Sequence, residues 1–156
     1  MSLLTRIALF TGSGFGVGFI PGAPGTWGSL LALPLVWLCY SYGGLSLVIA
    51  LTLLSCAASW LSTNRFEAVH GSDPGPLVMD EIAGQSLCLL LLFLWGLDGA
   101  ATYLAGFLFF RLFDITKILG ADAIQNLGGG AGVLLDDLLA GIYAHLAAGL
   151  VIVILL

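Results

Sequence analysis

The chain alternates long apolar stretches with shorter polar segments. The apolar stretches cover residues 27–40, 45–61, 82–97, 100–113 and 133–156. A helix needs about 20 apolar residues to cross a bilayer, and fewer where neighbouring helices shield it or the bilayer thins. The pattern therefore predicts an all-α fold, a polytopic membrane helical bundle of about five spans, with residues 1–156 forming a single domain.

The breaks between these stretches differ in length and polarity. The breaks at 41–44 and 98–99 are short, whereas 62–81 and 111–132 are long and polar. With five spans, both long breaks and the N-terminal segment fall on one face of the bilayer, which then carries every basic residue and every acidic residue except Asp98. Because basic residues gather on the cytoplasmic side of membrane proteins, we expect a multi-pass protein whose polar face is cytoplasmic.

The composition excludes several classes of protein. Hydrophobic residues make up 60% of the chain and charged residues only 8%, whereas a soluble domain carries about 25% charged residues. Four Lys and Arg residues in all provide no basic patch for nucleic acid. The three cysteines lie in apolar stretches without metal-ligand spacing, which indicates small buried side chains. We see no cleaved signal peptide at the N-terminus.

A segment rich in glycine and proline, residues 18–29, precedes the first apolar stretch. Thr26 or Ser29 could cap the helix that follows. The free N–H groups of a helix N-terminus also suit a phosphate group, so this segment is a candidate phosphate-binding site. A plain loop followed by a helix cap remains open as the structural explanation.

Two pairs of neighbouring carboxylates, Asp80–Glu81 and Asp136–Asp137, lie where polar segments meet apolar stretches. Asp114 lies between the two pairs in sequence. Neighbouring residues on a helix point about 100° apart, so one member of each pair can face the bundle axis. Hard carboxylate oxygens without Cys or His ligands favour Mg²⁺, with Mn²⁺ as a close competitor. We expect the catalytic residues to be Asp80, Glu81, Asp114, Asp136 and Asp137, with all of these except Asp137 as metal ligands. As an alternative to a metal site, Asp80 and Glu81 could simply stabilise the start of a helix through its dipole.

Basic residues accompany this acidic cluster. Arg111, Asp114 and Lys117 are spaced by three residues, so a helix through them would align all three on one face. Arg111 and Lys117 suit phosphate, the first as a planar fork and the second as a point charge. A surface ladder of ion pairs is the alternative. A metal site beside two phosphate-binding cations indicates phosphoryl chemistry.

Four blocks in order resemble the phosphatidylglycerophosphatase A family of bacterial membrane lipid phosphatases. They are PGAPGTWGSLLALP at 21–34, DPGPLVMDEIAGQ at 73–85, FRLFDITK at 110–117 and GGGAGVLLDDLLAG at 128–141. The resemblance therefore covers about residues 20 to 145. Departures from the family pattern are Ile118, where proline is common, Gly128, where histidine is frequent, and a segment at 118–127 that is poor in basic residues.

The resemblance implies hydrolysis of the lipid phosphatidylglycerophosphate to phosphatidylglycerol and phosphate, with Mg²⁺ as cofactor. It also implies a place in the bacterial cytoplasmic (inner) membrane with the site facing the cytoplasm. It assigns functional weight to Thr26, Asp80, Glu81, Arg111, Asp114, Lys117, Asp136 and Asp137. The oligomeric state stays open.

Two other functions compete with this interpretation. Intramembrane carboxylates also mark ion pathways, so a cation transporter or channel could use the same cluster, although transporter sites usually lie near the midplane. A non-catalytic assembly subunit would fit the small size and the helices rich in Gly and Ala. For a phosphatase, we expect water to attack phosphorus directly, with attack by Asp114 as the alternative.

Overall fold

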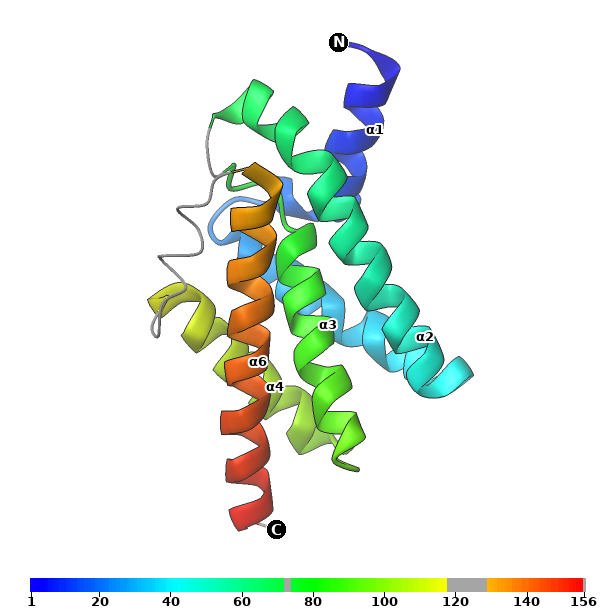
Figure 1. Ribbon diagram of the computed structural model, residues 1–156, viewed down its shortest axis with the longest axis vertical. Coiled ribbons are helices and arrows are strands. Elements are labelled where there is room, and N and C mark those ends of the chain that lie inside the picture. The colour runs from blue at the N-terminus through cyan, green and yellow to red at the C-terminus, as the bar shows by residue number, and fades with distance from the viewer. Residues whose placement is uncertain (72–73, 118–128, 156) are drawn as a thin grey trace.

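The computed structural model describes residues 1–71, 74–117 and 129–155. Over these residues the chain forms five α-helices and no strand, which confirms the all-α prediction. The helices are α1 (Leu3–Gly12), α2 (Pro24–His70), α3 (Met79–Leu94), α4 (Ala100–Thr116) and α6 (Gly129–Leu155), with a 3-10 turn, η1 (Val17–Phe19), between the first two. Figure 1 shows the helices gathered into an elongated bundle.

Helix α2 folds back on itself at Gly44. This residue has φ 59° and ψ −151°, a combination that is open to glycine and closed to residues with a Cβ. The reversal falls inside the predicted break at 41–44 and separates α2 into two arms, residues 24–43 and 45–70. Figure 1 shows the arms diverging from this turn, with the second arm running back toward the end of the bundle that holds the N-terminus.

Two helices, Pro24–His70 and Gly129–Leu155, are long and apolar enough to cross a membrane. Helices α3 and α4 have 16 and 17 residues, which is short of the usual spanning length. Each predicted apolar stretch lies mostly within a helix, while the count of five crossings stays a prediction. Large apolar side chains cover the outside of both long helices, including Trp37, Leu53, Leu54, Leu150 and Val153, as is typical of helices that face lipid.

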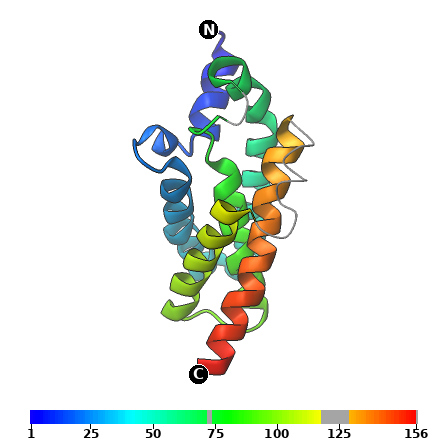
Figure 2. The same ribbon diagram turned by 90° about the vertical axis from the view of Figure 1, so that its left-hand side faces the viewer.

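Helix α3 occupies the centre of the bundle and packs against α2, α4 and α6. The main core contains Val36 and Val48 from the two arms of α2, Leu89 and Leu92 from α3, and Phe110 from α4. Figure 2 shows that α3 and α6 run in the same direction with α4 beside them. Because α3 and α6 are parallel and α4 is antiparallel to both, the starts of α3 and α6 meet the end of α4.

Two segments differ from the predicted elements. The second arm of α2 continues to His70, so about half of the predicted 62–81 loop is helical. The last turns of this arm are held in place because Phe66 is fully buried in a small core with Leu9 and Leu77. Helix α1 was not predicted as an element, since ten residues are too few to span a bilayer.

Candidate functional site

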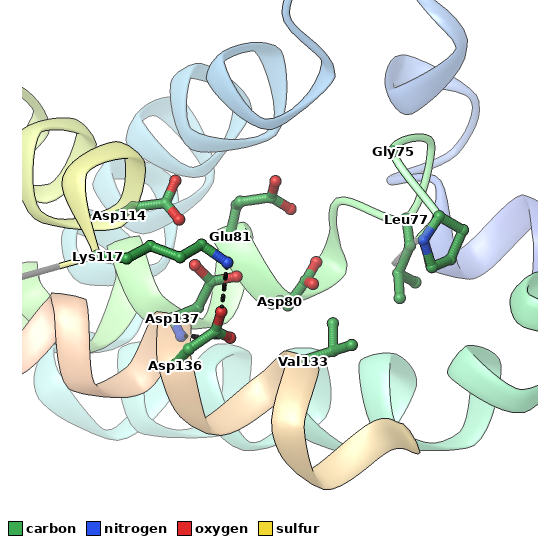
Figure 3. A pocket seen from close by; sticks show the side chains of 10 residues that line it. Gly75, Leu77, Asp80, Glu81, Asp114, Lys117, Val133, Asp136 and Asp137 are labelled. Atoms are coloured by element: carbon green, nitrogen blue, oxygen red, sulfur yellow. Dashed lines mark hydrogen bonds and ion pairs between the residues drawn. The ribbon is translucent and has the colours of Figure 1, made fainter. Parts of the chain in front are cut away.

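Three carboxylates from two helices meet at the end of the bundle where α3 and α6 begin. Asp80 and Glu81 lie in the first turn of α3, and Asp137 lies in α6. Each offers one oxygen, and these oxygens lie within 4.8 Å of one another. Asp80 and Asp137 are only 5% and 4% exposed. Figure 3 shows the three side chains pointing toward a common space.

A contact between two glycines sets the spacing of these helices. A Cβ on Gly84 of α3 would lie 2.5 Å from the Asp137 carbonyl oxygen, and a Cβ on Gly141 of α6 would lie 2.5 Å from the Gly84 carbonyl oxygen. The backbones therefore touch without intervening side chains. The same local pattern, Asp-x-x-Ala-Gly, occurs at 80–84 and at 137–141. Each Asp thus lies one helical turn before its glycine, which places the two aspartates opposite each other.

The first turn of α2 closes the site on the side of Glu81. A Cβ on Gly25 would collide with Glu81 Oε1 and would lie 3.2 Å from Arg111 Nη1. Only glycine at this position allows the α2 backbone to approach both side chains so closely. The N-terminus of α2, with its free backbone N–H groups, therefore lies directly beside the acidic cluster and Arg111.

Arg111 connects α2 and α4. Its Nη1 forms an ion pair with Asp114 Oδ2 one turn later on α4. The same nitrogen donates a hydrogen bond to Ser29 Oγ at 3.4 Å, and Ser29 Oγ donates to the Gly25 carbonyl oxygen at 2.9 Å. The guanidinium group is thereby fixed between the start of α2 and the end of α4.

Lys117 leaves the helical line that the sequence predicted for it. It is the C-cap of α4, with φ 47° in the left-handed region, and its Nζ donates to Asp136 Oδ2 of α6 at 2.9 Å (Figure 3). Arg111, Asp114 and Lys117 therefore do not form a ladder of ion pairs along one helix. Arg111 pairs within α4, and Lys117 joins α4 to α6.

A cavity of about 90 Å³ opens onto these groups. Its lining includes six of the eight predicted site residues, which are Asp80, Glu81, Asp114, Lys117, Asp136 and Asp137. Arg111 adjoins the cavity through its pair with Asp114. Thr26 is half-buried in the first turn of α2 and is not among the lining residues, so its phosphate-binding role stays a prediction.

The structure separates Asp137 from its neighbour Asp136. Asp137 groups with Asp80 and Glu81, whereas Asp114 and Asp136 lie in ion pairs with basic residues. We expected Asp114 and Asp136, and not Asp137, among the metal ligands. The sequence reasoning also missed the structural role of Gly25, Gly84 and Gly141, for which the repeated Asp-x-x-Ala-Gly pattern was an available signal. Ile118, Gly128 and the 118–127 segment lie outside the described residues.

The residues fit a hard divalent cation. Asp80 Oδ1 and Glu81 Oε2 are buried and have no hydrogen-bond partner in the described part of the chain. Burying a carboxylate without a partner is costly, and close carboxylates also repel each other. A bound cation would satisfy the free oxygens and offset their charge. The all-oxygen set matches what Mg²⁺ prefers.

Comparison with known proteins gives matches that cover most of the chain. The family model described as phosphatidylglycerophosphatase A matches residues 10–152. The Haemophilus influenzae phosphatidylglycerophosphatase A is 37% identical, covering 92% of this chain and 87% of its own. The Escherichia coli K12 phosphatidylglycerophosphatase A is 34% identical, covering 83% and 74%. A Bacteroides thetaiotaomicron protein named "Putative phosphatidylinositol-3-phosphatase" is 37% identical, covering 90% of each chain. No solved structure matches the chain significantly.

Proposed function

The chain belongs to the phosphatidylglycerophosphatase A family and is a phosphatase, a phosphoric monoester hydrolase; from this premise we propose that it hydrolyses phosphatidylglycerophosphate to phosphatidylglycerol and phosphate with Mg²⁺. The observation that carries this proposal is the meeting of three carboxylate oxygens within 4.8 Å beside Arg111 and Lys117. An anionic phosphoryl group needs both a cation and positively charged side chains around it.

In this proposal Asp80, Glu81 and Asp137 hold the cation. Asp114 and Asp136, which we first expected as ligands, act instead through their ion pairs with Arg111 and Lys117. Bound Mg²⁺ supplies Lewis acidity and offsets the charge on the phosphoryl group during its transfer. The rest of the site is built from the chain itself.

Arg111 and Lys117 bind the phosphoryl oxygens of the substrate. Arg111 is held by Ser29 and Asp114, so little side-chain freedom is lost when phosphate binds. Lys117 lines the cavity and donates to Asp136, from which its ammonium can also reach a phosphate in the cavity. The backbone N–H groups at the start of α2, near Thr26, add donors on the Glu81 side.

A lipid substrate would require this site to lie at a bilayer surface. We propose a multi-pass protein of the bacterial inner membrane with five crossings and the acidic cluster on the cytoplasmic side. The starts of α3 and α6 lie in the half of the bundle that holds the N-terminus, the end of α4 lies near the middle, and the C-terminus lies at the opposite end (Figure 1). The phosphate head group would enter from the aqueous side while the acyl chains remain in the bilayer.

Phosphate release from defined lipids tests this proposal. Purified protein in detergent should release phosphate from phosphatidylglycerophosphate, lose activity in excess chelator and regain it with added Mg²⁺. Phosphatidylinositol 3-phosphate, the substrate class in the name of the Bacteroides relative, serves as the competing lipid. Release from that lipid alone would overturn the proposed substrate. Release that persists in chelator would overturn the role of Mg²⁺, and cation flux in liposomes without hydrolysis would favour the transporter.

A further inference from the structure

Gln85 is a buried polar residue for which the proposed mechanism has no role. Its side chain is fully buried, and neither Nε2 nor Oε1 has a hydrogen-bond partner in the described residues. Most buried side-chain amides in folded proteins are hydrogen-bonded, because leaving donor and acceptor unpaired is costly. Partners gained in the working site would satisfy both of these atoms.

Helix geometry brings Gln85 next to Glu81. The two residues are four apart on α3, so they lie on the same face of the helix one turn apart. Glu81 Oε2 is itself buried and without a hydrogen-bond partner. Each carboxylate oxygen has two lone pairs, so Glu81 can bind a cation and accept an N–H bond together.

Helix α4 runs antiparallel to α3 and brings Arg111 between the levels of Glu81 and Gln85. A Cβ on Gly84 would lie 2.7 Å from the Phe110 ring, and Cys88 Sγ donates to the Gly106 carbonyl oxygen at 3.8 Å. Gln85 lies between these two contacts along α3, and Arg111 follows Phe110 along α4. Arg111 Nε is a third buried group without a partner.

These unpaired groups are complementary. Glu81 Oε2 is an acceptor, Arg111 Nε–H is a donor, and the Gln85 amide supplies one of each. We propose that Gln85 is a positioning residue that bridges them, donating from Nε2 to Glu81 and accepting at Oε1 from Arg111, directly or through one bound water on each side. The bridge fixes the cation ligand relative to the phosphate-binding arginine. This inference rests on the proposed cation site.

A pair of adjacent substitutions tests the bridge. Gln85→Leu keeps the side-chain size but removes both hydrogen-bonding groups. Ser86→Ala is the matched control, because Ser86 is also fully buried with an unpaired side-chain oxygen but points about 140° away from Glu81 around the helix. A merely structural role would affect both variants alike.

The readouts are Mn²⁺ affinity, measured by the spin-resonance signal of free Mn²⁺, and inhibition of the wild-type and variant enzymes by inorganic phosphate. Gln85→Leu should weaken Mn²⁺ binding about 10- to 100-fold, the range for residues that orient metal ligands, and should also weaken phosphate inhibition. Ser86→Ala should leave both unchanged. Gln85→Asn, whose amide is one methylene shorter, should resemble Gln85→Leu and replaces it if the leucine variant does not fold.

Each contrary result identifies what fails. Unchanged Mn²⁺ affinity in folded Gln85 variants would overturn the inference while the cation site stands. Equal losses in the Gln85 and Ser86 variants would also overturn it. Weaker Mn²⁺ binding with normal phosphate inhibition would remove Arg111 from the bridge. Wild-type protein that binds Mn²⁺ no better than Glu81→Gln would overturn the cation site itself, and the bridge with it.

Discussion

Gly84 and Gly141 lie in direct backbone contact, since a Cβ on Gly141 would come within 2.5 Å of the Gly84 carbonyl oxygen. Side chains at either position would force α3 and α6 apart. Asp80 and Asp137, one turn away on each helix, would separate with them. The acidic cluster therefore depends on two residues that carry no functional group.

Gly141→Ala should destabilise the protein and reduce activity together. Inserting a methyl group into a packed contact costs about 1–3 kcal/mol, and a small increase in the helix spacing moves Asp137 away from Asp80. Unfolding in detergent and phosphate release measure the two effects. Gly99→Ala is the control, because the Cβ position at Gly99 is open. Full activity in Gly141→Ala would show that the helix spacing does not control the cluster.

Asp137→Asn should abolish most of the activity while the protein still folds. The amide keeps the shape of the carboxylate but removes its charge, so we expect a loss of orders of magnitude in kcat and weaker dependence on Mg²⁺. Asp98→Asn is the matched control, because Asp98 lies outside the acidic cluster, in the turn between α3 and α4, and accepts a hydrogen bond from Tyr40. Near-normal turnover in Asp137→Asn would refute its place among the ligands.

The Lys117–Asp136 pair should show coupling in a double-mutant cycle. Lys117→Met leaves the buried Asp136 carboxylate without the ammonium 2.9 Å away, and removing one partner of a buried pair costs more than replacing both. The double variant Lys117→Met/Asp136→Asn should therefore unfold at a higher denaturant concentration than Lys117→Met alone. Additive effects of the two substitutions would show that the pair contributes no coupling.

Gly25→Ala should impair catalysis more than global stability. The added methyl would meet Glu81 Oε1 and approach Arg111 Nη1, so the first turn of α2 must move away from both. We expect a lower kcat and a higher KM for the lipid, with a denaturation midpoint close to that of Gly99→Ala. A wild-type kcat and KM in this variant would show that α2 need not approach the cluster.

Chemical trapping separates the two routes of attack. Rapid quenching during turnover, followed by reduction with borohydride, should leave Asp114 unmodified, because we propose direct attack by water and no aspartyl phosphate then forms. Asp114 is paired with Arg111, which holds its carboxylate as a partner of the guanidinium group. Mass spectrometry of the peptide containing Asp114 is the measurement, and conversion of Asp114 to homoserine would establish the covalent route.

The sequence predicted the helical fold and the meeting of the acidic and basic segments at one end of the bundle. It could not determine whether Asp136 or Asp137 faces the cluster, because residues 100° apart on a helix are distinguished only by the rotation of that helix in the bundle. The contact between Gly84 and Gly141 fixes this rotation and selects Asp137. The turn of Lys117 toward α6 likewise depends on a left-handed backbone at the end of α4.

The acidic cluster joins residues that are synthesised far apart in time. Asp80 and Glu81 enter with α3, whereas Asp137 arrives with α6 after another 50 or so residues of synthesis. A chain that has inserted only α1 to α4 thus carries two of the three cluster carboxylates, and it lacks the parallel helix that brings in the third. We therefore expect the nascent protein to gain its cation affinity late in membrane insertion, when Gly141 docks on Gly84.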